Sequence, residues 1–217
     1  MRYKRENEPL SSLTHLIGAG LAISALVLLV VYAAINHKTR LVVGFSIFGS
    51  AMILLYLSSA IYHFLCETRR AKKIFQKIDH IMIYFLIAAT YTPICFILPN
   101  RGFGWTIFGI IWGLAIFGAI LKAVGGKVKN VFSTIMYLAM GWLGVWALSS
   151  LLEILPKYSV LWLVGGGMAY SIGVLFFAID NYIPRTRWLG MHEVFHIFVI
   201  AGSFSHFWFM FRYVLHA

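Results

Sequence analysis

Long apolar segments follow one another along almost the whole chain, and they constrain its fold more than any other feature. Cutting the sequence at clusters of charge, glycine and proline leaves seven segments, at residues 12–35, 41–65, 78–98, 103–121, 131–152, 159–179 and 189–211. About 20 apolar residues suffice for a helix to cross a bilayer. Closed β-barrels are the other solution in lipid, but these segments are too long and lack the alternation of barrel strands. The sequence therefore predicts an all-α integral membrane protein, a bundle of seven transmembrane helices.

The composition excludes several other classes of protein. Hydrophobic residues make up 61% of the 217 residues and charged residues 12%, against about 45–50% and about 25% in soluble domains. A soluble globule, a disordered chain and a secreted disulfide scaffold are therefore excluded, and Cys66 and Cys95 predict neither a disulfide framework nor a Cys-rich zinc site. The first segment lacks a convincing cleavage site, so we expect a retained helix instead of a signal peptide. With short connections throughout, we expect a single transmembrane domain over residues 1–217.

Positive charge is distributed unevenly between the predicted connections. The chain has 18 Lys and Arg and a formal net charge of +11, which in a soluble protein would suggest nucleic acid. Here the charges lie between apolar segments, so we expect membrane lipids as partners and no nucleic acid. The N-terminus and the even-numbered connections carry 13 Lys and Arg, and the opposite face carries 5. Basic connections stay in the cytoplasm, so we predict a cytoplasmic N-terminus and an outside C-terminus; the oligomeric state stays open.

Five of the eight histidines fall at one predicted depth near the inner leaflet. His63 ends the second helix, His80 opens the third, and His192, His196 and His15 lie at the starts of the seventh and first helices. An ionisable side chain inside a bilayer costs a few kcal/mol unless it is paired, hydrated or bound to metal. This convergence is the strongest indication of a functional site in the sequence.

The spacing of these histidines suits a metal site. His192 and His196 are four residues apart and therefore share one helix face. Together with His63 they would supply three neutral imidazoles, and zinc bound in this way keeps a fourth position for water, as in catalytic sites. We predict His63, His192 and His196 as ligands of a Zn²⁺ ion. Imidazole also suits copper, iron or nickel, so the choice of zinc rests partly on a family resemblance.

Two polar side chains lie at the same predicted depth and are our candidate catalytic residues. Asp79 could orient the metal water or take its proton, and Ser59, one turn before His63, could add a hydroxyl group. Each has a structural alternative. Ser59 could bond back to the carbonyl one turn earlier, and Asp79 could be favoured at a helix start by the macrodipole.

The remaining ionisable side chains have other predicted roles. The segment His192-Glu193-x-x-His196 matches the zincin motif, but Glu193 points about 100° away from His192 around the helix, so we do not favour a protease. We expect His15 and His80 to be interfacial, with their polar tips in water. His206 lies about 15 Å beyond the histidine pair, too far for the same metal, and is expected to form interhelical hydrogen bonds. Asp180 and Glu153, at span ends, are expected to be solvated.

The three motifs together resemble a known family. Ser59-Ala-Ile-Tyr-His63, Lys77-Ile-Asp79-His80 and His192-Glu-Val-Phe-His196 occur in order on the second, third and seventh helices. This combination resembles the hemolysin III branch of the progestin and adipoQ receptor (PAQR) family. Glu8 and Thr14-His15-Leu-Ile-Gly, before and at the first span, also resemble that branch. The match covers nearly the whole chain.

The resemblance implies a cofactor and a set of functions. In that family the matching Ser, first His, Asp and paired His build an intramembrane zinc site with three His ligands, and alkaline ceramidases are proposed relatives. It therefore implies a zinc-bearing protein of the bacterial plasma membrane that hydrolyses lipid amide or ester bonds. Members of the branch have also been connected with control of membrane fluidity, and the branch is named for haemolysis. A nonenzymatic membrane-state sensor with a structural zinc and a pore-forming cytolysin are thus the alternatives.

Overall fold

The computed structural model describes residues 8–66, 70–124, 130–180, 182–184, 186 and 190–217. Within these ranges the regular secondary structure is entirely helical, as predicted. The helices are α1 (Pro9–Ile35), α2 (Thr39–Phe64), α3 (Arg70–Ile97), α4 (Arg101–Val124), α5 (Asn130–Trp142), α6 (Leu148–Ile154), α7 (Ser159–Ile179) and α8 (Met191–Arg212). Two short 3₁₀ helices, η1 (Leu143–Ala147) and η2 (Val214–His216), complete the list.

Seven helical segments of the described chain are long and apolar enough to cross a membrane, which confirms the predicted number of spans. The fifth span differs from the prediction of one continuous helix, because η1 separates α5 from α6. The Tyr91 hydroxyl of α3 donates hydrogen bonds to the carbonyls of Met140 and Gly141, at 2.8 Å and 2.7 Å. A side chain from a neighbouring helix therefore satisfies carbonyls next to the point where the α-helical pattern changes.

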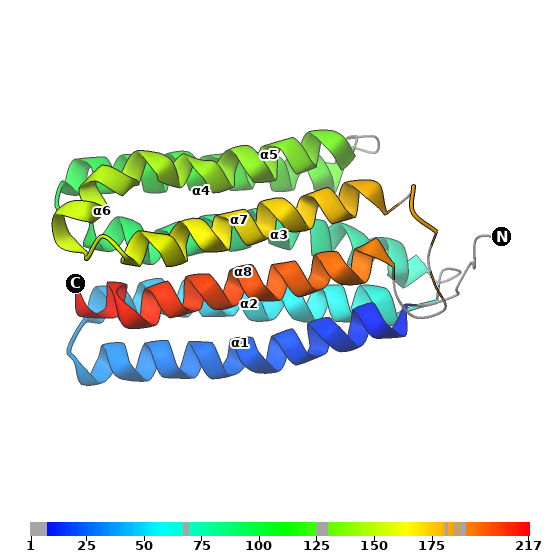
Figure 1. Ribbon diagram of the computed structural model, residues 1–217, viewed down its shortest axis with the longest axis horizontal. Helices are drawn as coiled ribbons and strands as arrows, with labels where there is room; N and C mark the ends of the chain where they lie inside the picture. Colours follow the sequence, from blue (N-terminus) through cyan, green and yellow to red (C-terminus); the bar gives the residue numbers. More distant parts are fainter. Residues whose placement is uncertain (1–7, 67–69, 125–129, 181, 185, 187–189) are drawn as a thin grey trace.

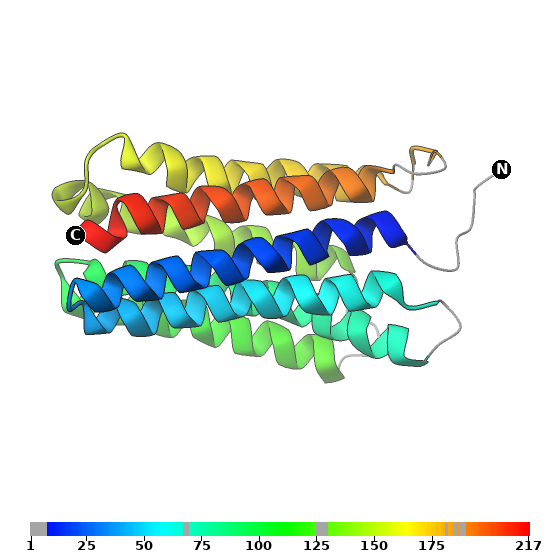
Figure 2. The same ribbon diagram turned by 90° about the horizontal axis from the view of Figure 1, so that it is seen from below.

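The helices form an elongated bundle in which α1 packs on α2 and α8, α2 on α3, α3 on α4, and α7 on α8 (Figures 1 and 2). The start of α1 and the end of α8 lie at opposite ends of the bundle (Figure 1). The end of α2 and the start of α8 lie at the same end as the start of α1 (Figure 2). This arrangement places the predicted ligands of α2 and α8 at one end of the bundle.

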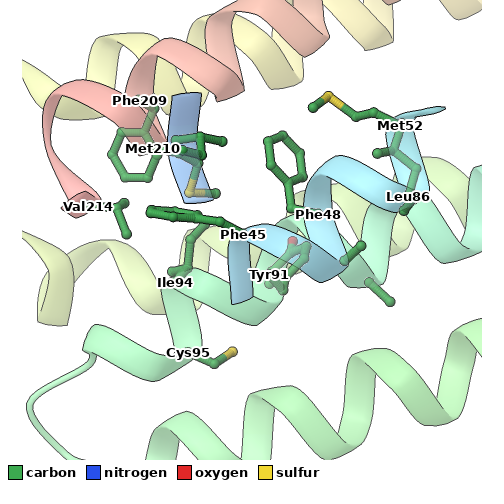
Figure 3. Packing of buried hydrophobic residues seen from close by; sticks show 14 of the residues in the cluster. Phe45, Phe48, Met52, Leu86, Tyr91, Ile94, Cys95, Phe209, Met210 and Val214 are labelled. Atoms are coloured by element: carbon green, nitrogen blue, oxygen red, sulfur yellow. The ribbon is translucent and has the colours of Figure 1, made fainter. Parts of the chain in front are cut away.

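The interior is filled by aromatic and aliphatic side chains from α2, α3 and α8, with η2 closing one end. Phe45 and Phe48 of α2 lie close to Phe209 and Met210 of α8 (Figure 3). Small residues let α1 approach its neighbours closely, because Ala22, Ala25 and Ala33 are buried along it. Many of the large apolar side chains of α1 are instead exposed; they include Leu13, Leu16, Ile17, Leu21, Val27 and Val31. An apolar surface of this kind suits contact with lipid.

Candidate metal centre

The end of α2 and the start of α8 bring three imidazoles together. His63 lies in the last turn of α2, and His192 and His196 lie in the first two turns of α8. One ring nitrogen of each lies within 4.8 Å of the others, and His63 Nε2 is 3.2 Å from His192 Nε2. Two nitrogens bound at about 2.0–2.1 Å to one tetrahedral ion have a similar separation. The three residues could therefore hold one metal ion, as their spacing in the sequence suggested.

Groups from the first two turns of α1 bond the outer nitrogens of two of these rings. Glu8 Oε2 lies 2.6 Å from His63 Nδ1, and a carboxylate can only accept, so Nδ1 carries the proton and Nε2 keeps its lone pair. His196 Nδ1 lies 3.3 Å from Thr14 Oγ1, and the Thr14 hydroxyl donates a hydrogen bond to the Ser11 carbonyl at 2.9 Å. Outer hydrogen bonds of this kind fix the tautomer and orientation of a ligand histidine. The donor set therefore fits a metal that prefers nitrogen ligands.

The first turn of α8 is itself anchored by carboxylates. Glu193 is buried, and its oxygens accept hydrogen bonds from Ser11 Oγ at 3.0 Å and from the Gly190 N–H at 2.8 Å. Glu193 therefore joins α8 to α1, a structural role that agrees with our rejection of a zincin-type base. Asp180, which was expected to be solvated, is half-buried, and its Oδ1 accepts a hydrogen bond from the His192 backbone N–H at 2.9 Å. Glu153 is exposed on α6, as expected.

The structure also corrects the predicted position of His15. Its side chain is 3% exposed, and its ring stacks on His196 with centroids 3.6 Å apart. Neither ring nitrogen has a hydrogen-bond partner among the described residues. The reason is tertiary: α1 turns its Ser11 and His15 face toward α8, so the ring lies inside the bundle instead of at the headgroups. His80 is half-buried, and its Nδ1 lies 2.6 Å from the Gln76 carbonyl.

Ser59 and Asp79 lie beside the three histidines. The Ser59 hydroxyl and the His63 imidazole both lie close enough to the Asp79 carboxyl to interact with it electrostatically. Ser59 is fully buried and Asp79 is half-buried. This pairing joins α2 to α3 and gives Ser59 a partner on another helix. A carboxylate held next to an imidazole cluster can orient or accept a proton.

The site opens on a cavity of about 280 Å³ that continues through the bundle. His63, His192, His196, Ser59 and Asp79 all line it. Most of the remaining wall is apolar, and it is formed by side chains of α3, α5, η1, α6, α7 and α8, among them Ile83, Leu86, Ile87, Leu138, Leu151, Val164 and Val174. Such a cavity, polar at one end and apolar along its length, suits a ligand with a polar head and a hydrocarbon tail.

Glu8, Ser11 and Thr14 were not predicted to contact the proposed ligands. Glu8, Ser11 and Thr14 recur at intervals of three residues, which places them near one another on a helix. That spacing could have indicated a polar face at the start of α1. The residues that this face contacts could not be predicted from such spacing, because Glu8 and His63 are more than fifty positions apart in the sequence.

The chain is similar in sequence to known proteins over most of its length. A model of a family described as "Haemolysin-III related" matches residues 3–207. The chain is 38% identical to "Hemolysin-3" of Bacillus cereus, over 97% of this chain and 93% of that protein. It is 40% identical to "Hemolysin-3 homolog" of Bacillus subtilis, over 91% and 90%. It is also 26% identical to the human "Monocyte to macrophage differentiation factor", over 77% of this chain and 69% of that protein.

Proposed function

The chain belongs to the haemolysin-III related family, and from that premise we propose that it is a zinc-dependent hydrolase of lipid amide or ester bonds. One observation carries the proposal: three imidazoles share a largely apolar cavity with a neighbouring carboxyl and hydroxyl group, those of Asp79 and Ser59. The polar end of this cavity offers groups for chemistry, and the apolar walls suit an acyl chain.

The location of the protein supports a lipid substrate. Its seven apolar helices and its bacterial relatives place it in the bacterial plasma membrane. Trp142 and Val145 both line the cavity, and 38% and 50% of their surfaces are exposed. The cavity therefore reaches the outer, lipid-facing surface beside η1. A lipid could reach it laterally without leaving the membrane.

Each residue of the site has a chemical role in this proposal. His63, His192 and His196 would hold the ion, and Glu8 keeps His63 in the tautomer that would bind it through Nε2. Zinc supplies Lewis-acid activation of water and of the substrate carbonyl when it is bound. Asp79 accepts the proton of the attacking water and returns it to the leaving amine or alcohol. Ser59, whose hydroxyl lies beside the Asp79 carboxyl, orients that carboxyl.

The test is fatty-acid release by the purified protein, with metal content measured on the same sample. We expect release from a ceramide or a phospholipid, loss of release after chelation, and recovery when zinc is restored. His63→Ala should abolish release, whereas His216→Ala, a change at an exposed histidine of η2, should leave it unchanged. Release that persists in metal-free protein would refute the mechanism.

A second candidate function is a nonenzymatic sensor or regulator of membrane state. The observation that favours it is that His63 of α2 and His192 and His196 of α8 lie close enough to hold one ion, since a metal there would join these two helices. In that case chelation should lower the melting temperature with no lipid product in the parallel assay. A third hypothesis is a cytolysin, because two relatives are named hemolysin. Dye release from liposomes that is unaffected by His192→Ala would favour this hypothesis.

A further inference from the structure

The cavity has a second opening, at the end of the bundle that holds the candidate metal centre. Tyr62, Gln76 and His80 line it there, and we call these three residues the polar mouth. Gln76 is exposed and Tyr62 is half-buried, so the cavity reaches the surface at this end as well as beside η1. Gln76 Nε2 donates a hydrogen bond to the Tyr62 hydroxyl at 3.1 Å, which joins α3 to α2 at the mouth.

Lys72 extends the wall of the cavity by one helical turn. The residues of α3 that line the cavity include Gln76, His80 and Ile83, whose spacing of three or four residues places them on one face. Lys72 precedes Gln76 by four residues and therefore lies on the same face. Its Nζ lies 5.4 Å from the centroid of the Tyr62 ring, a cation–π contact. The ammonium group is thus held directly at the polar mouth.

The charge of Lys72 is not neutralised by a carboxylate of the described residues, since none forms an ion pair with it. The carboxylates at this end of the bundle have other partners. Glu8 bonds His63, and Asp79 lies beside the same imidazole. Glu193 accepts two hydrogen bonds from other groups. The ammonium group of Lys72 is therefore available to a negatively charged group of a ligand.

Lys122 of α4 adds a second positive charge at the mouth. It is half-buried and lies close enough to His80 to interact with it electrostatically. Two cations thus flank the polar mouth, whereas most of the remaining wall of the cavity is apolar. Basic pockets between membrane helices typically bind the head groups of anionic lipids.

We propose that the cavity binds a phospholipid with a net negative charge, with its phosphate at the polar mouth and an acyl chain along the apolar wall. Lys72 and Lys122 attract the phosphate, and the Gln76 amide nitrogen has a second N–H for one of its oxygens. A zwitterionic head would bring a further positive charge toward the two lysines, which disfavours it.

This placement of the head also positions the bonds to be cleaved. Lys72 precedes Asp79 by seven residues, about 10 Å along α3. The ester bonds of a phospholipid are only a few bonds from its phosphate, so they lie toward Asp79 and the histidines. The inference rests on the proposed function only in assuming that a lipid occupies the cavity, and it favours phospholipid esters over ceramide, which has no phosphate.

The test measures lipid binding to the purified protein by native mass spectrometry from a neutral detergent. The probes are dioleoyl phosphatidylglycerol and dioleoyl phosphatidylcholine, which have the same chains and a phosphate but differ in net charge, and glycerol phosphate, which has no chain. We expect the phosphatidylglycerol to bind about tenfold more tightly than the phosphatidylcholine, and an equal concentration of glycerol phosphate not to displace it. Equal affinities of the two lipids, or displacement by glycerol phosphate, would overturn the inference.

Matched variants assign the preference to the polar mouth. Lys72→Gln should reduce it severalfold, Lys72→Arg should keep it, and the double variant with Lys122→Gln should abolish it. Lys77→Gln is the control and should keep most of the preference. It removes the same charge from the same helix, but Lys77 points about 100° away from Gln76 and donates to the Ala123 carbonyl of α4 at 3.3 Å. Equal losses in Lys72→Gln and Lys77→Gln would overturn the assignment, and these single variants decide the question if the double variant does not fold.

The result for binding is independent of the result for hydrolysis. Because binding is measured without turnover, a protein that prefers the anionic lipid and releases no fatty acid would refute the hydrolase and leave this inference standing. Fatty-acid release by a protein that binds both lipids equally would refute this inference and leave the hydrolase standing.

Discussion

The two halves of α8 use histidine in different ways. In the first half, His192 and His196 meet His63, and the outer nitrogens of His63 and His196 are bonded by groups of α1. In the second half, His206 is held by a single backbone carbonyl of α7. The difference teaches what an intramembrane metal site requires. Convergence of ring nitrogens needs oriented side chains from several helices, whereas the lone His206 ring is bonded through one nitrogen, and its Nδ1 has no partner among the described residues.

The first half of α8 differs from the second half in its contacts with the start of α1. Glu8 and Thr14 contact the histidines of α2 and α8, and Ser11 bonds Glu193. Around His206 the neighbouring polar side chains bond one another or the backbone. Metal retention should therefore depend on α1 and be insensitive to changes at His206.

The largest expected effect is the loss of metal from a ligand variant. His63→Ala should reduce the bound zinc from one ion per chain to none, because two imidazoles cannot complete the site. The stabilisation by bound metal, about 4 kcal/mol at a thousandfold excess over Kd, should be lost with it. Elemental analysis and thermal unfolding with and without chelator measure both quantities. His206→Leu is the contrasting variant and should keep its zinc; full zinc content in His63→Ala would contradict the assigned ligands.

A smaller effect is expected at the carboxyl beside the cluster. Asp79→Asn should lower fatty-acid release by about 10²- to 10⁴-fold, the usual contribution of a general acid or base. Zinc content should stay at the wild-type level, because Asp79 is not among the three ligands. Asp180→Asn is the matched control, since an amide oxygen can still cap α8 and Asp180 does not line the cavity. Unchanged release by Asp79→Asn would remove this residue from the mechanism.

The next effect is expected at Glu8, whose carboxylate accepts the hydrogen bond from His63 Nδ1. Glu8→Ala should weaken zinc binding by about 10- to 100-fold, because the imidazole loses the partner that fixes its tautomer. Glu8→Gln should lie between this variant and the wild type, since it keeps an acceptor oxygen but loses the charge. Competition with a chelator of known affinity gives the values, and Glu153→Gln, an exposed change on α6, is the control. Equal zinc affinity in all four proteins would show that α1 does not support the site.

The smallest effect is expected at His15. His15→Phe keeps a ring that can stack on His196 and removes two nitrogens that have no partner among the described residues. Zinc affinity should not change, and metal-free stability should stay the same or rise by up to about 1–3 kcal/mol, the cost of a buried unsatisfied polar group. Chemical denaturation of the metal-free protein measures this. A loss of zinc from His15→Phe would instead make His15 part of the metal centre.

The residues that could be predicted from the sequence are those whose position follows from local geometry. His192 and His196 share a face because they are four residues apart on one helix, and His63 joins them because α2 ends where α8 begins. The break at η1, the buried position of His15 and the contact of Asp180 with α8 were not predicted. Each depends on a partner from another helix: Tyr91 of α3 at the break, His196 of α8 on His15, and the His192 backbone on Asp180.

The sequence by itself determined the number and nature of the spans, because a long apolar segment in lipid can satisfy its backbone in only a few ways. The tertiary structure decided which face of each helix points inward. In a soluble bundle, the polar face of each helix marks its outer side. These helices are apolar almost all around, so hydrophobicity does not distinguish their lipid-facing side from their buried side. Small buried residues and interhelical hydrogen bonds select the faces instead. That selection brings the start of α1 onto the histidines and leaves a cavity between them and His206.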